Sequence, residues 1–108
     1  LSNQPYDFVV ADNGQQAIEA TLRERPDLIL LDIMMPDMDG YEVVEHLKQS
    51  ATSANIPVIM ISAKTAVEDK VRGMELGIDD YIAKPFDKRE VNARIRMVMR
   101  RFGWTEEE

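Results

Sequence analysis

Residues 26–40 read Pro-Asp-Leu-Ile-Leu-Leu-Asp-Ile-Met-Met-Pro-Asp-Met-Asp-Gly. The four successive apolar residues 28–31 predict a strand that is covered on both faces, as in a parallel sheet. Asp32 follows directly, at the carboxyl end of that strand, where open parallel sheets gather their functional groups. The rest of the stretch contains proline and glycine and predicts a loop before the next helix.

Short apolar runs alternate with amphipathic stretches along the rest of the chain. Asp87 is a candidate N-cap for the last helix and Gly77 a candidate C-cap for the helix before it. Strands that alternate with helices predict right-handed crossovers and an α/β fold, with helices on both faces of a parallel sheet. The predicted strands cover 8–11, 28–31, 58–61 and 81–83, and the predicted helices cover 15–25, 41–49, 66–76 and 88–102.

The spacing of apolar residues predicts which side of each helix meets the core. The predicted core-facing side chains are Ala17, Ile18 and Leu22 in the first helix, Val43, Val44 and Leu47 in the second, and Val91, Ile95, Val98 and Phe102 in the last.

Length and composition favour one domain over residues 1–108, with 103–108 as a frayed tail. The chain has no cysteine, which excludes disulfides, thiolate zinc sites and cysteine nucleophiles, and its single histidine, His46, disfavours a histidine metal site. No apolar run approaches a membrane span and no signal peptide opens the chain, so we expect no membrane partner and a cytoplasmic address.

The formal net charge of -7 argues against nucleic-acid binding by this domain. One C-terminal segment is basic although the chain as a whole is acidic. We prefer to interpret it as a solvated helix face rather than as a specific partner surface. Its basic residues are Lys88, Arg89, Arg94, Arg96, Arg100 and Arg101.

Three of the predicted strand ends carry a polar group: Asp32, Ser62 and Lys84. If the strands are neighbours, these side chains meet at one edge of the sheet. The set could be a structural ion pair with a hydroxyl beside it. It could equally be a carboxylate nucleophile toward phosphorus, with a cation and a hydroxyl for the transferred group and a hard cation such as Mg²⁺ beside them.

Three motifs resemble the receiver domains of two-component response regulators. Residues 27–40 are similar to the phosphoacceptor region, 57–63 to the strand that carries a serine or threonine, and 77–86 to the strand that ends in Lys-Pro. Ser62 and Lys84 follow Asp32 by 30 and 52 residues, intervals that are ordinary in this family. The resemblance covers essentially the whole chain and implies a flavodoxin-like, doubly wound parallel sheet, the receiver fold.

The resemblance also implies a role for each matching residue. Asp32 would accept phosphate from a phosphohistidine on a sensor histidine kinase or a phosphotransfer protein. Lys84 would pair first with the carboxylate and then with the phosphoryl group. Ser62, with its neighbour Ala63, would contact a phosphoryl oxygen. Tyr81 occupies the position of an aromatic switch that turns inward when Ser62 moves.

Further expectations follow from the same resemblance. The backbone carbonyl of Met34 would bind Mg²⁺ together with Asp32, and the bond between Lys84 and Pro85 is a candidate cis peptide. The face formed by residues 66–102 would be the signalling surface, read by an output domain or a partner protein. The expected protein is a phosphoacceptor and not an enzyme.

One segment of the family is not found in this sequence. Receiver domains begin with a strand that ends in two acidic Mg²⁺ ligands, so we expect an N-terminally incomplete domain that binds Mg²⁺ weakly or not at all. In the family the missing strand lies between the strands that match 8–11 and 28–31. The chain could belong to a longer receiver, could take a strand from a second chain as a homodimer or by strand complementation, or could bring 8–11 directly beside 28–31. Asp12 is a poor substitute acid, because a turn role before Asn13 and Gly14 explains it better.

Two other functions are compatible with parts of the pattern. A receiver-fold interaction module that is not phosphorylated would explain the incomplete metal site. A phosphatase of the haloacid dehalogenase type would also use Asp32 as nucleophile, but it needs a second aspartate where this chain has Met34. Residues 13–16 do not form a glycine-rich dinucleotide loop.

Overall fold

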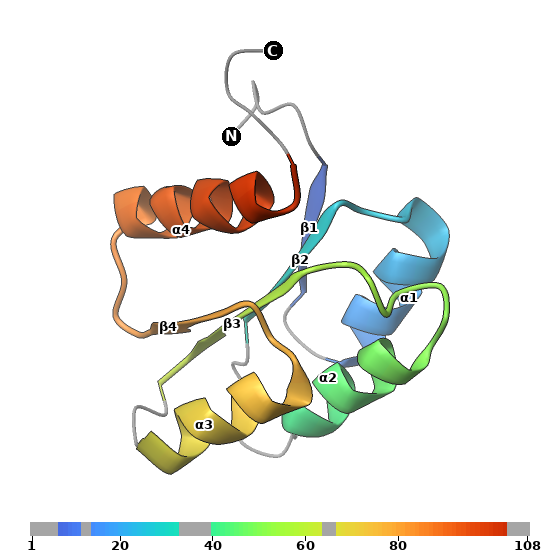
Figure 1. Cartoon of the computed structure of the whole chain (residues 1–108), viewed down its shortest axis with the longest axis horizontal. Coiled ribbons are helices and arrows are strands. Elements are labelled where there is room, and N and C mark those ends of the chain that lie inside the picture. The colour runs from blue at the N-terminus through green and yellow to red at the C-terminus, as the bar shows by residue number, and fades with distance from the viewer. Residues whose placement is uncertain (1–6, 12–13, 33–39, 64–66, 104–108) are drawn as a thin grey trace.

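The computed structural model describes residues 7–11, 14–32, 40–63 and 67–103, which form four strands and four helices (Figure 1). Strands and helices alternate along the chain as predicted, and no bound differs from the predicted one by more than one residue. In chain order the elements are β1 (Phe8–Ala11), α1 (Gly14–Glu24), β2 (Leu28–Asp32), α2 (Gly40–Gln49), β3 (Val58–Ser62), α3 (Val67–Leu76), β4 (Asp80–Ala83) and α4 (Lys88–Arg101).

All pairings in the sheet are parallel, and the strand order is β1-β2-β3-β4. Val10 pairs with Leu30, so β1 is bonded directly to β2 and no described strand lies between them. This is the third of the three predicted arrangements. It satisfies the backbone groups along this side of β2 within the described chain, where an empty slot would leave several of them unpaired at about 1–3 kcal/mol each.

Helices cover both faces of the sheet, as Figure 1 shows: α4 lies on one side, and α1, α2 and α3 lie on the other. Because side chains alternate along a strand, β2 contributes Ile29 and Leu31 to one core cluster and Leu28 and Leu30 to the other. The continuous apolar runs of β2 and β3 are therefore explained by burial on both faces, as predicted.

The predicted core faces of the helices are confirmed for α2 and corrected at one position each in α1 and α4. Val43, Val44 and Leu47 of α2 are buried. In α1, Leu22 is 60% exposed, and the neighbouring Thr21 is buried because its hydroxyl donates to the carbonyl of Ala17 at 2.7 Å. A hydroxyl that bonds to its own helix can enter a core without an unmet donor.

The end of α4 differs from the sequence prediction. Val91, Ile95 and Val98 are buried, whereas Phe102 is 49% exposed and lies just beyond the helix. Its backbone N–H donates to the carbonyl of Met99 at 3.0 Å. Phe102 thus closes the last turn of α4 through its backbone and does not extend the buried stripe.

Two aspartates tie the strands together where they begin. Asp27 accepts from the N–H of Asp7 at 2.8 Å and donates its own N–H to the carbonyl of Asp7 at 2.7 Å. In the same way, the Asp79 carboxylate accepts from the N–H of Val58 at 2.9 Å, and the N–H of Asp79 donates to the carbonyl of Val58 at 2.8 Å. Each aspartate therefore bonds across to the preceding strand in the sequence and supports the register with which β1–β2 and β3–β4 pair.

Both predicted helix caps are present. Asp87 accepts from the N–H of Arg89 at 2.7 Å, and the Arg89 side chain and N–H together lower the pKa of the Asp87 carboxyl. Gly77 has φ +103°, a conformation that strains other residues. Its N–H donates to the carbonyl of Met74, and the N–H of Ile78 donates to the carbonyl of Gly73. This is a left-handed C-cap that ends α3 ahead of β4.

Candidate functional site

The three predicted strand-end residues lie along the carboxyl edge of the sheet. Asp32 is the last residue of β2 and Ser62 the last of β3, and Lys84 directly follows β4. Adjacent strands lie about 4.8 Å apart. The strand order β2-β3-β4 therefore brings together groups that are 52 residues apart in the sequence.

Asp32 and Lys84 form the central contact of this edge. The Lys84 Nζ lies 2.7 Å from the Asp32 Oδ1, and the two side chains are 24% and 19% exposed. Oδ1 is itself buried beside this ammonium. The accessible part of the Asp32 side chain therefore lies on its other atoms.

The register of the strands places Ser62 and Tyr81 on one side of the sheet. Met60 pairs with Tyr81, and Ser62 continues the same alternation two residues later. Asp32 follows the alternation of Leu30, on the side of α4. The Ser62 side chain is buried, and its carbonyl accepts the N–H of Lys84 at 2.9 Å, so the backbones of β3 and of the Lys84 segment are joined next to the ion pair.

The remaining predicted site positions are placed as follows. Ala63 is exposed beside Ser62, and the bond between Lys84 and Pro85 is cis. Tyr81 is buried, with 7% of its surface exposed. Met34, Asp12 and Ala66 lie outside the described residues, as does the predicted tail from residue 104 onward.

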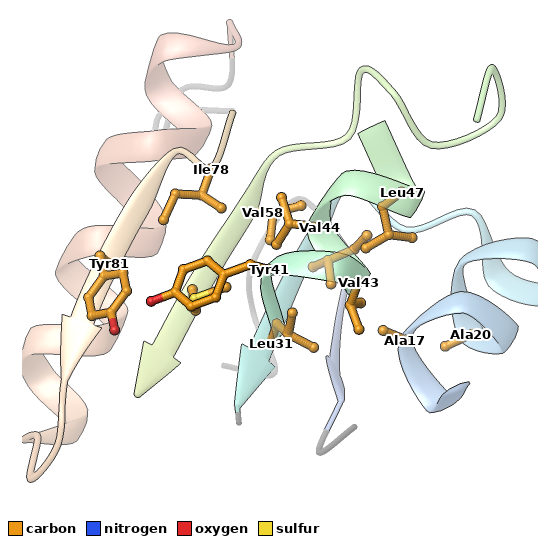
Figure 2. Packing of buried hydrophobic residues seen from close by; sticks show 12 residues of the cluster. Ala17, Ala20, Leu31, Tyr41, Val43, Val44, Leu47, Val58, Ile78 and Tyr81 are labelled. Atoms are coloured by element: carbon orange, nitrogen blue, oxygen red, sulfur yellow. The ribbon is translucent and has the colours of Figure 1, made fainter. Parts of the chain in front are cut away.

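A second tyrosine, Tyr41 at the start of α2, was not singled out by the sequence. Its hydroxyl donates to the carbonyl of Asp69 at 3.1 Å and forms a hydrogen bond with Tyr81. Figure 2 shows the Tyr41 hydroxyl directed toward Tyr81. The guanidinium carbon of Arg72 lies 4.4 Å from the centroid of its ring. Burial is the largest cause that raises the pKa of Tyr41 far above its ordinary value, and the positive charge of Arg72 lowers it.

The described residues do not complete a magnesium site. Asp32 supplies a hard oxygen of the kind that Mg²⁺ prefers. Within 7–11, 14–32, 40–63 and 67–103, however, no three carboxylate, imidazole or thiolate groups come together around a point where an ion could bind. Receiver domains typically bind Mg²⁺, but among the described residues only Asp32 offers a carboxylate at this strand end.

The predicted signalling face includes α3, β4 and α4. The Nη1 of Arg94 on α4 donates to both carboxylate oxygens of Asp80 at the start of β4, at 3.0 and 3.1 Å, and its Nε lies 3.2 Å from the Glu90 carboxylate. Apolar side chains remain exposed on both helices: Val67, Val71, Met74 and Met97. In the described part of the chain, no helix has the length and apolar character needed to cross a membrane.

Comparisons with known proteins agree with this fold. The family model of the response regulator receiver domain matches residues 1–96. The chain is 46% identical over 101 residues to the alkaline phosphatase synthesis transcriptional regulatory protein PhoP of Bacillus subtilis, covering 94% of this chain and 41% of that protein. It is 45% identical over 98 residues to the phosphate regulon transcriptional regulatory protein PhoB of Pseudomonas aeruginosa, covering 91% and 43%. The chain thus spans less than half the length of these relatives.

Solved structures show the same architecture. The BeF3-activated N-terminal receiver domain of Klebsiella pneumoniae RstA matches with a TM-score of 0.70 and 33% identity, covering 85% of this chain and 76% of that one. A two-component response regulator from Clostridium difficile matches in fold, with a TM-score of 0.75 at 23% identity, over 87% and 75%. With a family model over residues 1–96, these relatives and this sheet, the chain belongs to the response regulator receiver domain family.

Proposed function

We propose that Asp32 is the residue that accepts a phosphoryl group in this receiver domain. The observation that supports it best is the Lys84 ammonium 2.7 Å from the Asp32 carboxylate, at the carboxyl edge of a parallel sheet. An ordinary surface ion pair contributes little to the stability of a fold and can lie anywhere on its surface. This one lies where α/β sheets bind ligands, and the Ser62 hydroxyl belongs to the adjacent strand end.

The chemistry that these groups can perform is a phosphoryl transfer. An oxygen of Asp32 forms a bond to the phosphorus of a phosphohistidine, and the bond from phosphorus to the imidazole nitrogen breaks. The nitrogen leaves with the bonding pair and takes a proton from solvent, and Asp32 becomes an acyl phosphate. The positive charge of Lys84 would then balance the added negative charge, and the Ser62 hydroxyl and the N–H of Ala63 would donate to phosphoryl oxygens.

The proposed partners follow from this chemistry. A sensor histidine kinase or a phosphotransfer protein would supply the phosphoryl group, and an output domain or partner protein would contact the face formed by α3, β4 and α4. Response regulators interact with kinases and carry output domains as a family. Because one carboxylate ligand is placed at the edge, we propose that Mg²⁺ binds this chain weakly and that small phosphodonors label it slowly.

Incubation with phosphoramidate or acetyl phosphate and Mg²⁺, followed by intact mass spectrometry, tests the proposal. The expected result is a slow gain of one phosphoryl mass that hydroxylamine removes, since acyl phosphates react with that nucleophile. Asp32→Asn should abolish the gain. Asp27→Asn is the matched control, because Asp27 lies at the opposite end of β2 and an amide oxygen can still accept from Asp7.

Two results would contradict the proposal. One is equal labelling of Asp32→Asn and the unchanged chain. The other is no labelling after prolonged incubation of a folded protein, which would favour a receiver-fold interaction module that does not use phosphate. Rapid, stoichiometric labelling would contradict only the expectation that Mg²⁺ binds weakly.

A further inference from the structure

Tyr81 has a partner that fixes its position, and this partner lies on another element. We infer that Tyr41 is a positioning residue for Tyr81, holding the Tyr81 ring in its buried place through a hydroxyl pair anchored on α3. The inference rests on the proposed function only where it concerns signalling, because a switch role for Tyr81 requires phosphorylation of Asp32. The positioning itself is a property of the unmodified protein.

The hydroxyl pair has a defined direction. A phenol has one O–H proton, and that of Tyr41 is donated to the Asp69 carbonyl, which can only accept. In the hydrogen bond between the two phenols, the Tyr41 oxygen is therefore the acceptor and the Tyr81 hydroxyl the donor. Figure 2 shows the Tyr41 hydroxyl directed toward the hydroxyl end of the Tyr81 ring.

Tyr41 is itself held firmly. Its side chain is 5% exposed, and the Arg72 guanidinium lies over its ring at 4.4 Å, within the range of a cation–π contact. Asp69 and Arg72 both belong to α3, so two separate contacts tie the Tyr41 ring to that helix. The hydroxyl that receives the Tyr81 hydrogen bond is thus fixed with respect to α3.

Tyr81 also packs against α3 directly, at a position where the helix lacks a side chain. A Cβ on Gly73 would lie 2.7 Å from the Ile78 Cδ1 and 3.6 Å from the Tyr81 Cδ2. The inward Tyr81 therefore contacts α2 through its hydroxyl and α3 through its ring. A movement of α3 therefore changes both the hydrogen bond and the ring contact of Tyr81. Conversely, an outward turn of Tyr81 leaves the Tyr41 oxygen without the donor of that hydrogen bond.

Tyr41→Phe removes the acceptor hydroxyl and keeps the ring under Arg72. Loss of one such hydrogen bond should raise the outward population of Tyr81 by about two- to tenfold. The measurement is NMR of protein labelled with ¹³C on its tyrosine rings, which has three tyrosines: Tyr6, Tyr41 and Tyr81. A soluble gadolinium chelate should relax the Tyr81 ring protons more strongly in Tyr41→Phe than in the unchanged chain.

Thr21→Val is the matched control, because it removes a buried hydroxyl of α1 that bonds within its own helix. It should leave the relaxation of Tyr81 unchanged. Equal relaxation in Tyr41→Phe and the unchanged chain would overturn the inference, and so would an equal increase in Thr21→Val. If Tyr41→Phe does not fold, the unchanged chain decides: nuclear Overhauser effects between the two tyrosine rings are expected, and their absence overturns the inference.

This experiment uses no phosphodonor, so its result is independent of whether Asp32 is phosphorylated. A second measurement addresses the proposed function separately. Tyr41→Phe should still gain one phosphoryl mass, because Tyr41 is not part of the edge that holds Asp32 and Lys84. Failure of labelling in the unchanged chain would sink the proposed function and leave the positioning of Tyr81 to be decided by the relaxation data.

Discussion

At the scale of single residues, Lys84 neutralises a carboxylate that is largely removed from water. Lys84→Met keeps an unbranched apolar stem and removes the charge next to Asp32. We expect the free energy of unfolding to fall by about 1–3 kcal/mol, because a mostly buried carboxylate loses its cation. Urea denaturation followed by circular dichroism measures the change. The double variant with Asp32→Asn should recover most of the loss, and a failure to recover would show that Lys84 stabilises the fold by another route.

The raised pKa of Tyr41 predicts how the stability of the fold depends on pH in alkaline solution. The pKa of Tyr41 is raised in the folded protein, so the unfolded chain releases this proton first, near pH 10. The folded state then holds more protons than the unfolded state, and stability must fall as pH rises through about 10 and above. Tyr41→Phe should lose stability less steeply with pH than the unchanged chain in urea denaturation series. Parallel slopes for the two proteins would contradict the buried hydroxyl network.

The residues of the edge were predictable and the tyrosine pair was not. Asp32, Ser62 and Lys84 each end a strand or follow it, and chain order with the parallel rule brings such residues to one edge. Tyr41 and Tyr81 are 40 residues apart in the sequence, and their contact depends on how α2 and β4 pack against α3. No local sequence pattern encodes such a contact. The one available signal was Gly73, since a glycine inside a predicted helix often marks a close approach by another element.

At the scale of elements, the strand starts depend on two aspartates in different surroundings. Asp79→Ala leaves the N–H of the buried Val58 without its acceptor, which should cost about 1–3 kcal/mol. Asp27→Ala frees the N–H of Asp7, an exposed group that water can satisfy, so its cost should be clearly smaller. Asp79→Asn retains an acceptor and should lie near the unchanged chain. Equal losses for the two alanine variants, measured in urea, would contradict this assignment.

Element types followed from periodicity, while their ends and faces needed tertiary contacts. The spacing of α1 favoured Leu22 over Thr21, yet Thr21 fills the core because it satisfies its hydroxyl on the Ala17 carbonyl. The apolar stripe of α4 ran on to Phe102, yet the helix ends before this residue and its side chain is half exposed. The apolar pattern gives a direction around a helix, and the neighbouring elements decide where the buried part stops.

At the scale of the whole molecule, the sheet has an edge at β1 that pairs only with β2 among the described strands. Val10 in this strand is 54% exposed on the α4 side, beyond the cover that α4 gives to β2. An open parallel edge with an exposed apolar residue favours strand addition by another chain. We expect concentration-dependent association in light scattering, reduced by Val10→Lys. A monomeric mass at high concentration for the unchanged chain would contradict this prediction.

The pairing of β1 with β2 could not be decided from the sequence, because three arrangements satisfied the same strand pattern. Periodicity identifies a strand but carries no information about its neighbour, and the structure shows the direct pairing of 8–11 with 28–31. The order of β2, β3 and β4 followed from the resemblance to receiver domains, and the structure confirms it.

The most direct test of the central claim is to locate the modified residue. After prolonged treatment of the chain with phosphoramidate and Mg²⁺, borohydride reduction converts an aspartyl phosphate into homoserine, which tandem mass spectrometry can locate in a peptide. The account predicts homoserine at position 32 and at no other aspartate. Homoserine at another aspartate, or unmodified Asp32 in a folded and fully treated sample, would contradict it.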